Sequence, residues 1–182
     1  MSTLQYIKHQ DIDFKKWDNT ILHSQIPFVF AQSFYLNATC PNWDALVIGD
    51  YETVFPITYK TKFGYRYLPQ PPFTSQLGTF GKLSLDAEQQ FYNYILEHFR
   101  LIDLELNVTN QLKSGFISPK NTYTLNYSEG YKFNKNTKRN IVKAQENGFV
   151  VESVKSQEII KLSKTYLNPF LEKEVGLSNA TV

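Results

Sequence analysis

The sequence predicts an α+β protein built on a mixed, mostly antiparallel central sheet that is flanked by helices. Strand-like segments follow one another in runs, with helix-like segments between the runs, and do not alternate strictly with helices. Hydrophobic residues make up 42% of the chain, and its fourteen Phe and twelve Tyr argue against disorder. A length of 182 residues suffices for one full core, or for one domain plus a fragment of another.

The N-terminal region is expected to begin with a strand and a short helix. Residues 4–7 indicate the strand, and either Asp11 or Asp13 can cap the helix that follows. Helical spacing places three apolar side chains on the buried stripe of this helix, namely Phe14, Trp17 and Ile21. Residues 26–30 form an apolar connector marked by a proline, and residues 32–36 predict a short helix or turn.

A hairpin is predicted next. Apolar and β-branched residues at 45–49 and 53–60 indicate two strands, joined by the turn signal Gly49-Asp50. Pro56 lies inside the second strand. Because proline cannot donate a ladder hydrogen bond, its position indicates an edge or a bulge.

The middle of the chain adds strands, a broken loop and a helix. Residues 65–68 indicate an aromatic strand, whereas residues 69–81 hold three prolines and two glycines and predict an ordered loop. Ser84 is expected to cap a helix whose core-facing residues are Phe91, Tyr94, Ile95 and Phe99. Alternating apolar and polar residues predict a strand at 102–108, and another strand is expected at 123–127.

A basic amphipathic helix is predicted at 134–147. Its apolar side chains share one side (Phe133, Thr137, Ile141 and Ala144), and basic side chains share the other (Lys132, Lys135, Arg139 and Lys143). Gly148 stands where a left-handed cap is expected, a strand is predicted at 149–154, and Ser156 is expected to cap a last helix. We therefore expect a first domain at 1–154 and, at 155–182, a helix that opens a second, truncated domain.

The composition bounds the kinds of site that the chain can hold. Its one cysteine, Cys40, excludes an intramolecular disulfide and a cysteine-based zinc site, and a buried thiol is expected. Three scattered histidines lack metal-ligand spacing, so no metal is expected. With a net charge of +2, any affinity for nucleic acid has to come from a local patch. No apolar run is long enough to span a bilayer, and a cytoplasmic protein is expected.

Three blocks of residues follow the order of a known family. They are Gln32-Ser33-Phe34-Tyr35, then Tyr67-Leu68-Pro69-Gln70-Pro71-Pro72, then Lys138-Arg139-Asn140-Ile141 with Lys143-Ala144 and Asn147-Gly148. Together they resemble signatures of the Fem-type peptidyltransferases, which are double-domain relatives of the GNAT-type N-acyltransferases. Gln70-Pro71 stand where that family has Arg-Gly, which removes a cation that could hold a carboxylate or phosphate.

The resemblance implies a GNAT-like fold and an N-acyltransferase-like protein, which transfers an acetyl or aminoacyl group to an amine. The chain would be its N-terminal, substrate-binding domain. Acetyl-CoA or an aminoacyl-tRNA would be the donor, and an amine-bearing small molecule or a cell-wall precursor would be the acceptor. The substrate-binding positions that the resemblance implies are Gln32, Tyr35, Tyr67, Gln70, Arg139 and Lys143.

The catalytic residues and the function both have open alternatives. Asp103 and Glu105 lie on the polar face of a predicted strand and could supply a general base, or could be solvated or salt-bridged carboxylates. The coenzyme A motif of GNAT enzymes is not found in the sequence. A non-catalytic binding domain with the GNAT fold is therefore the main alternative. A third hypothesis is nucleic-acid binding through the basic helix and the nearby Tyr127 and Tyr131.

Overall fold

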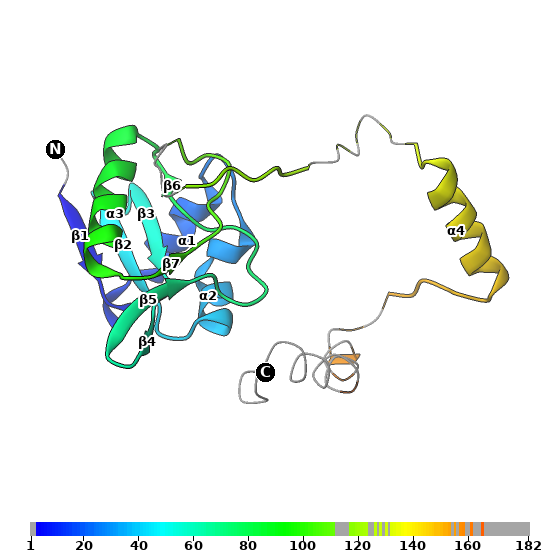
Figure 1. The fold of residues 1–182 in the computed structure, drawn as a ribbon, viewed down its shortest axis with the longest axis horizontal. Helices are drawn as coiled ribbons and strands as arrows, with labels where there is room; N and C mark the ends of the chain where they lie inside the picture. The colour runs from blue at the N-terminus through cyan, green and yellow to red at the C-terminus, as the bar shows by residue number, and fades with distance from the viewer. Residues whose placement is uncertain are drawn as a thin grey trace. The chain divides into compact units, whose positions relative to one another are not determined.

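The structure is a computed structural model that describes residues 3–111, 117–123 and 132–153, with residues 126, 128, 130, 155, 157, 158, 161 and 165 (Figure 1). The chain divides into two units, Met1–Pro119 and Lys120–Val182, and each is described by itself. This division lies earlier in the chain than the domain boundary that the sequence predicts, which stays a prediction. None of the helices in the described part of the chain is long and apolar enough to cross a bilayer.

A four-stranded antiparallel sheet forms the centre of the first unit. Its strands are β1 (Leu4–Ile7), β2 (Asp44–Ile48), β3 (Thr53–Ile57) and β6 (Phe80–Gly81), in the order β1-β2-β3-β6. The predicted hairpin is the pair β2–β3, and Gly49 in its turn has a φ of +66°, a conformation that glycine adopts without steric cost. The α+β class with an antiparallel sheet is confirmed.

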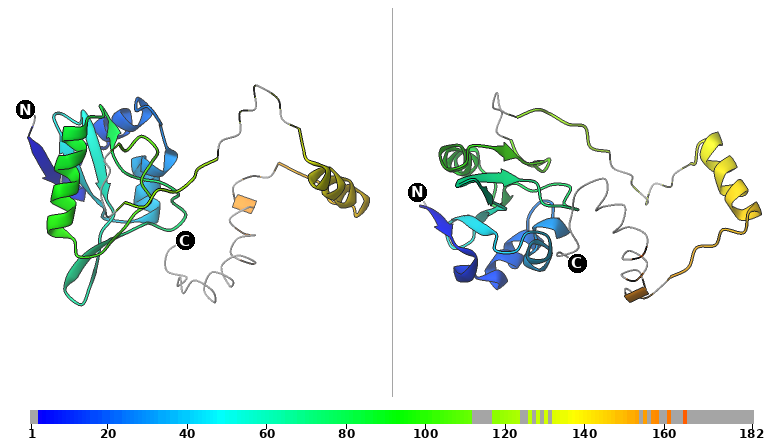
Figure 2. Two further views of the ribbon diagram at one scale, coloured as in Figure 1. Left: turned by 45° about the horizontal axis from the view of Figure 1, so that its top comes forward. Right: turned by 60° about the horizontal axis from the view of Figure 1, so that its bottom comes forward.

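Helices cover both faces of this sheet (Figure 2). On one face lie α1 (Phe14–Leu22) and α2 (Ser33–Thr39), and Trp17 of α1 is fully buried there. On the other face lies α3 (Leu85–His98), with Phe91 fully buried. Two short 3-10 turns, η1 (His9–Asp11) and η2 (Val29–Ala31), lie in the connections.

The central strand β2 shows why the two layers of helices hold together. All five of its residues are buried. Ala45 and Val47 belong to the core under α1 and α2, whereas Leu46 and Ile48 belong to the core under α3. Because side chains alternate along a strand, a continuous apolar run fits a strand that is covered on both faces.

The helix starts follow the side chains that the sequence suggests as caps. Asp13 Oδ1 accepts the backbone N–H groups of Lys15 and Lys16, both at 3.1 Å, and Ser84 Oγ accepts that of Ala87 at 3.1 Å. Each cap satisfies N–H groups that the first turn of a helix leaves without a partner. Both predicted helices are thereby confirmed.

A smaller sheet lies beside the first one and carries part of the candidate site. Its order is β4-β5-β7, with β4 (Lys60–Lys62) antiparallel to β5 (Tyr65–Pro69), and β5 parallel to β7 (Ile102–Asp103). The loop predicted at 69–81 is wrong at its two ends, because Pro69 belongs to β5 and Phe80–Gly81 form β6 against β3. Between them, Leu77 forms an isolated bridge with Leu106. Pro56 of β3 lies beyond the two positions at which β3 pairs with β6, which fits an edge.

The strand predicted at 102–108 is wrong beyond Asp103, apart from the bridge at Leu106. Asn107 turns the chain directly after this bridge, and its own N–H still donates to the Leu77 carbonyl at 2.7 Å. Its Oδ1 accepts hydrogen bonds from the backbone N–H and the hydroxyl of Thr109, at 3.0 and 2.5 Å. Such a local side-chain bond folds the backbone into a turn and competes with the strand ladder.

The second unit contains α4 (Lys135–Glu146), which is the predicted basic helix. Asn134 Oδ1 caps it by accepting the N–H of Thr137 at 2.8 Å. At the other end Gly148 has a φ of +75°, and the N–H of Phe149 donates to the carbonyl of Ala144 at 3.0 Å, as in a Schellman cap.

The strands predicted at 123–127 and 149–154 are not found among the described residues. The strand predicted at 149–154 is wrong over the described residues 149–153, which are in no strand. Tyr123 and Asn126 are in no strand either, and the rest of the strand predicted at 123–127 lies outside the described residues. Ser156, the expected cap of the last helix, also lies outside them.

Candidate functional site

A depression of about 510 Å³ opens in the first unit where β1, β2 and the small sheet meet. Its volume is within the roughly 300–1,000 Å³ that small-molecule sites occupy. The lining residues come from four separate stretches of the chain and are Tyr6, Lys8, His9, Gln10, Asn42, Asp44, Tyr59, Thr61 and Arg66. Most of them are polar, so the depression offers more hydrogen-bonding groups than apolar contact.

Asp44 is the buried anion of this site, at 5% exposure. Its Oδ1 accepts the backbone N–H of His9 at 2.8 Å, and its Oδ2 accepts the hydroxyl of Tyr6. Pairing of Ile7 with Ala45 places Tyr6 diagonally across from Asp44 on the same face of the sheet. The first residue of a buried strand can therefore be an acid, because β1 and the turn η1 that follows it each supply a donor to one of its oxygens.

Arg66 on β5 of the small sheet contacts both Tyr6 and Asp44. Its Nη2 donates to Tyr6 Oη at 2.6 Å and lies 3.8 Å from Asp44 Oδ2. Its guanidinium carbon lies 4.1 Å from the centre of the Tyr59 ring and 5.0 Å from that of Phe99. Cation–π contacts of this kind hold the planar guanidinium in one orientation.

Tyr6 serves as a hydrogen-bonding group here and not as a base. Burial raises the pKa of its phenol, the hydrogen bond to Asp44 raises the pKa further, and the Arg66 guanidinium opposes both effects. The result is a pKa well above the usual range, so the phenol keeps its proton at neutral pH. It donates that proton to Asp44 while it accepts from Arg66.

His9 is oriented by its surroundings. Its Nδ1–H donates to the carbonyl of Trp43 at 2.9 Å, and its ring packs edge-on against Trp43 with 5.8 Å between centres. Because a carbonyl can only accept, Nδ1 carries a proton and Nε2 is the nitrogen left for other partners.

The charges of the depression do not cancel. Two cations, Lys8 and Arg66, and one anion, Asp44, line it, which leaves one net positive charge while His9 is neutral. Lys8 is exposed and pairs with no acid among the described residues. The depression therefore favours ligands with a negative group.

Side chains of the first two family-like blocks both contact the loop after β5, away from the depression. Tyr35 Oη donates to the carbonyl of Phe73 at 2.5 Å. Gln70 Nε2 donates to the carbonyl of Thr74 at 3.0 Å, and Gln70 Oε1 accepts the N–H of Glu105 at 3.0 Å. These side chains bind the loop after β5 to its neighbours, and neither Tyr35 nor Gln70 lines the depression.

The other residues that the sequence singles out lie in different places. Tyr67 follows Arg66 on β5 and so faces the opposite side of the strand, and Gln32 precedes α2 without a side-chain cap bond. Asp103 is exposed on β7 opposite Pro69. Asp103 and Glu105 do not line the depression.

Arg139 and Lys143 belong to α4 in the second unit, and both are exposed. Arg139 Nη2 donates to Asn136 Oδ1 at 2.9 Å, one turn earlier in the same helix. Their role as substrate-binding residues stays a prediction.

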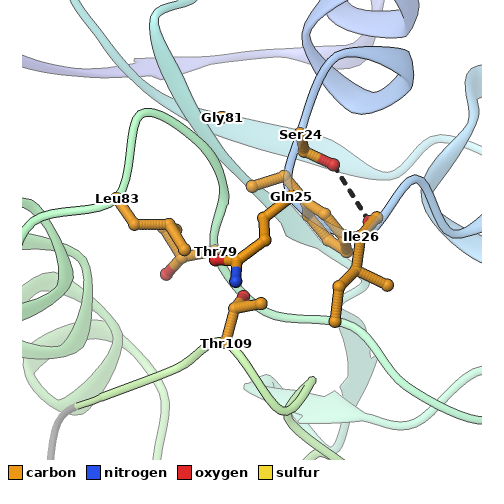
Figure 3. Close-up of a pocket in the computed structure, with 8 residues that line it drawn as sticks. Ser24, Gln25, Ile26, Thr79, Gly81, Leu83 and Thr109 are labelled. Carbon is orange, nitrogen blue, oxygen red and sulfur yellow. Dashed lines mark hydrogen bonds between the residues drawn. The ribbon is translucent and has the colours of Figure 1, made fainter.

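Two further features do not offer a site. Cys40 is buried, as expected, and its burial raises the pKa of the thiol, which disfavours the reactive thiolate. A second hollow, lined by Ser24 to Ile26, Thr79 and Thr109 among others, has essentially no volume for a water molecule (Figure 3). In it the Ser24 hydroxyl donates to the carbonyl of Ile26 at 2.9 Å.

Sequence reasoning missed the four residues at the centre of the depression, which are Tyr6, His9, Asp44 and Arg66. One signal was present, because Arg66 interrupts the aromatic strand Tyr65-Arg66-Tyr67. The rings that contact its guanidinium are those of Tyr59 and Phe99, which are 7 and 33 positions away. Its polar partners Tyr6 and Asp44 are 60 and 22 positions away, so only the fold could reveal the whole cluster.

No family model, no curated protein and no solved structure matches this chain. The resemblance to the Fem-type and GNAT-type proteins therefore stands on the three blocks of residues alone. A function has to be argued from those blocks together with the geometry of the depression.

Proposed function

We propose that the first unit is the substrate-binding domain of an N-acyltransferase-like protein of the GNAT or Fem type, and that it holds an amine-bearing small molecule. The observation that carries this proposal is the depression of about 510 Å³ with its oriented polar groups. The order of the three family-like blocks supports the acyltransferase part of the proposal.

The cluster around Asp44 gives the depression a rigid wall. Tyr6, His9 and Arg66 are each bonded or stacked in one orientation, so a ligand does not have to order them. Groups that are ordered before binding lower the entropic cost of binding. Gln10, Asn42 and Thr61 add neutral acceptors that suit an amine.

The reaction of this class is transfer of an acyl group to an amine. The neutral amine attacks the carbonyl carbon of the donor, a C–N bond forms, the bond to the donor's sulfur or oxygen breaks, and the amine proton passes to a base. Acetyl-CoA or an aminoacyl-tRNA would be the donor. Both are anionic, and the five basic residues from Lys132 to Lys143 on and beside α4 support such a partner.

A non-catalytic binding domain with the same fold is the second candidate. It is favoured by the use of Tyr35 and Gln70, which hold the loop after β5 in place. The position of Asp103 and Glu105 outside the lining of the depression favours it too. In that case the depression binds its ligand and no acyl group moves.

Binding and transfer can be tested separately on the whole chain. We expect 5-aminopentanamide to shift the backbone NMR signals of residues 8–10, 61 and 66, and pentanamide, which lacks the amine, to shift them much less. Equal shifts from both compounds would contradict an amine site. Release of free thiol from acetyl-CoA in the presence of the amine would favour the acyltransferase, whereas amine binding without thiol release would favour the binding domain.

A further inference from the structure

We propose that the depression recognises a carboxylate of its ligand through Arg66 and Lys8, so that the ligand class is a small amino acid-like molecule with both an amine and an acid group. This inference rests on the proposed function, because it names a second group on the same amine-bearing ligand. It adds a recognition site at residues that the three family-like blocks do not contain.

Asp44 leaves little capacity for a cation of the ligand. Its two oxygens already accept from His9 N–H and Tyr6 Oη, and Arg66 Nη2 lies 3.8 Å away. The carboxylate is thus satisfied inside the protein and only 5% exposed. An acid in this condition offers little to a cationic ligand, although it holds Arg66 and Tyr6 in place.

Arg66 has donor capacity that the protein does not use. A guanidinium has five N–H donors. One bond from Nη2 goes to Tyr6 Oη, and Nε is buried without a hydrogen-bond partner. The side chain is nevertheless 36% exposed at the depression, so the guanidinium is partly open to a ligand. A carboxylate fits two parallel donors of such a fork.

Lys8 adds a positive charge beside Arg66. Asp44 balances Arg66, and Lys8 then leaves one unit of positive charge where the acid group of the ligand would lie. A carboxylate neutralises this local charge, whereas a phosphate dianion at the same place would leave an excess of negative charge. The ammonium of the ligand faces the neutral lining residues Gln10, Asn42 and Thr61, which leave the local balance unchanged.

Four compounds of one chain length separate the two groups of the ligand. They are 5-aminopentanoate, 5-aminopentanamide, pentanoate and pentanamide, each titrated into the isotope-labelled full chain and followed by NMR. We expect each carboxylate to bind about tenfold more tightly than the matching amide, as for a charge-assisted bidentate contact. Inorganic phosphate is expected to compete less well than pentanoate.

Variants assign the effect to residues. Arg66→Gln should abolish the preference for the carboxylates, and Lys8→Gln should reduce it about threefold. Lys62→Gln is the matched control, because Lys62 is an exposed cation on β4 that does not line the depression. If Arg66→Gln fails to fold, the exposed Lys8 variant still decides the question.

The outcomes for the two proposals differ. Three results would overturn the carboxylate inference and leave an amine site intact. The amides could bind as tightly as the carboxylates, phosphate could bind more tightly than pentanoate, or the Lys8 and Arg66 variants could keep the preference for carboxylates. Carboxylate binding that is indifferent to the amine would overturn the proposed function instead. Absence of binding by all four compounds would overturn both.

Discussion

The helices α1 and α4 have the same design in sequence, and yet only α1 has a buried apolar face. Each begins at a side-chain cap, Asp13 for α1 and Asn134 for α4, and each carries apolar residues at helical spacing. Trp17 and Ile21 of α1 are fully buried, whereas Ile141 of α4 is 38% exposed. Caps and periodicity therefore specify a helix, but burial comes from the strands and helices that pack against it.

The largest expected effect tests burial directly. Trp17→Ala should lower the free energy of unfolding by roughly 3–5 kcal/mol, because it leaves a cavity in the core. It also removes the hydrogen bond from Trp17 Nε1 to the Ala31 carbonyl at 2.7 Å and the contact with the Trp43 ring at 4.6 Å. Ile141→Ala in α4 is the counterpart and should cost less than about 1 kcal/mol. Urea unfolding followed by far-ultraviolet circular dichroism measures both. Equal losses would mean that α4 buries its apolar face in solution.

A smaller effect is expected from a buried charge. Asp44→Asn should lower the free energy of unfolding by about 2 kcal/mol, less than the roughly 3–5 kcal/mol of a fully buried pair. The expected loss of stability is smaller because the Arg66 side chain is 36% exposed, so water can solvate its guanidinium. Glu146→Gln, at an exposed position of α4, is the control and should change nothing measurable. A stable Asp44→Asn variant would show that Arg66 finds another partner.

Removing a helix cap should have a similar effect in both units, because capping is a local interaction that does not depend on burial. Ser84→Ala at the start of α3 should cost roughly 1 kcal/mol of stability. Asn134→Ala should reduce the helix content of α4, which carbon chemical shifts of residues 135–146 report. A loss of helix in α4 with no loss in α3 would show that packing hides the contribution of the cap in the first unit.

The smallest effect concerns the basic face of α4. If the second unit contacts an anionic donor such as an aminoacyl-tRNA, Arg139→Gln and Lys143→Gln should each lower the slope of log affinity against log salt by about one. Fluorescence anisotropy with a labelled tRNA at several salt concentrations measures this slope. Lys62→Gln in the first unit is the control, and a wild-type affinity that does not change with salt would contradict the contact.

Local signals predicted α1, α3 and the β2–β3 hairpin of the first unit. Asp13 and Ser84 mark the helix starts, and the turn at Gly49 marks the hairpin. The wrong strand predictions lie where a side chain bonds the nearby backbone, or where an apolar segment has no strand to pair with. Asn107 turns the chain by bonding Thr109, and the apolar run at 149–151 has no neighbouring strand among the described residues.

The candidate site was much less predictable. The residues implied by family resemblance, such as Tyr35 and Gln70, hold a loop, while the depression is lined by residues without a motif. Tyr6, Asp44 and Arg66 are joined only because β1 pairs with β2 and the small sheet lies alongside. No spacing in the sequence encodes that contact.

By itself the sequence determined the α+β class, the caps and faces of α1, α3 and α4, and the β2–β3 hairpin, because these depend on neighbours within a few positions. The tertiary structure decided which apolar faces are buried and which charges meet. Those outcomes depend on contacts between residues distant in the chain, such as the 38 positions that separate Tyr6 from Asp44. Burial raises the pKa of Tyr6 and orients Arg66 at the depression, and burial is a property of the packed molecule and not of a segment.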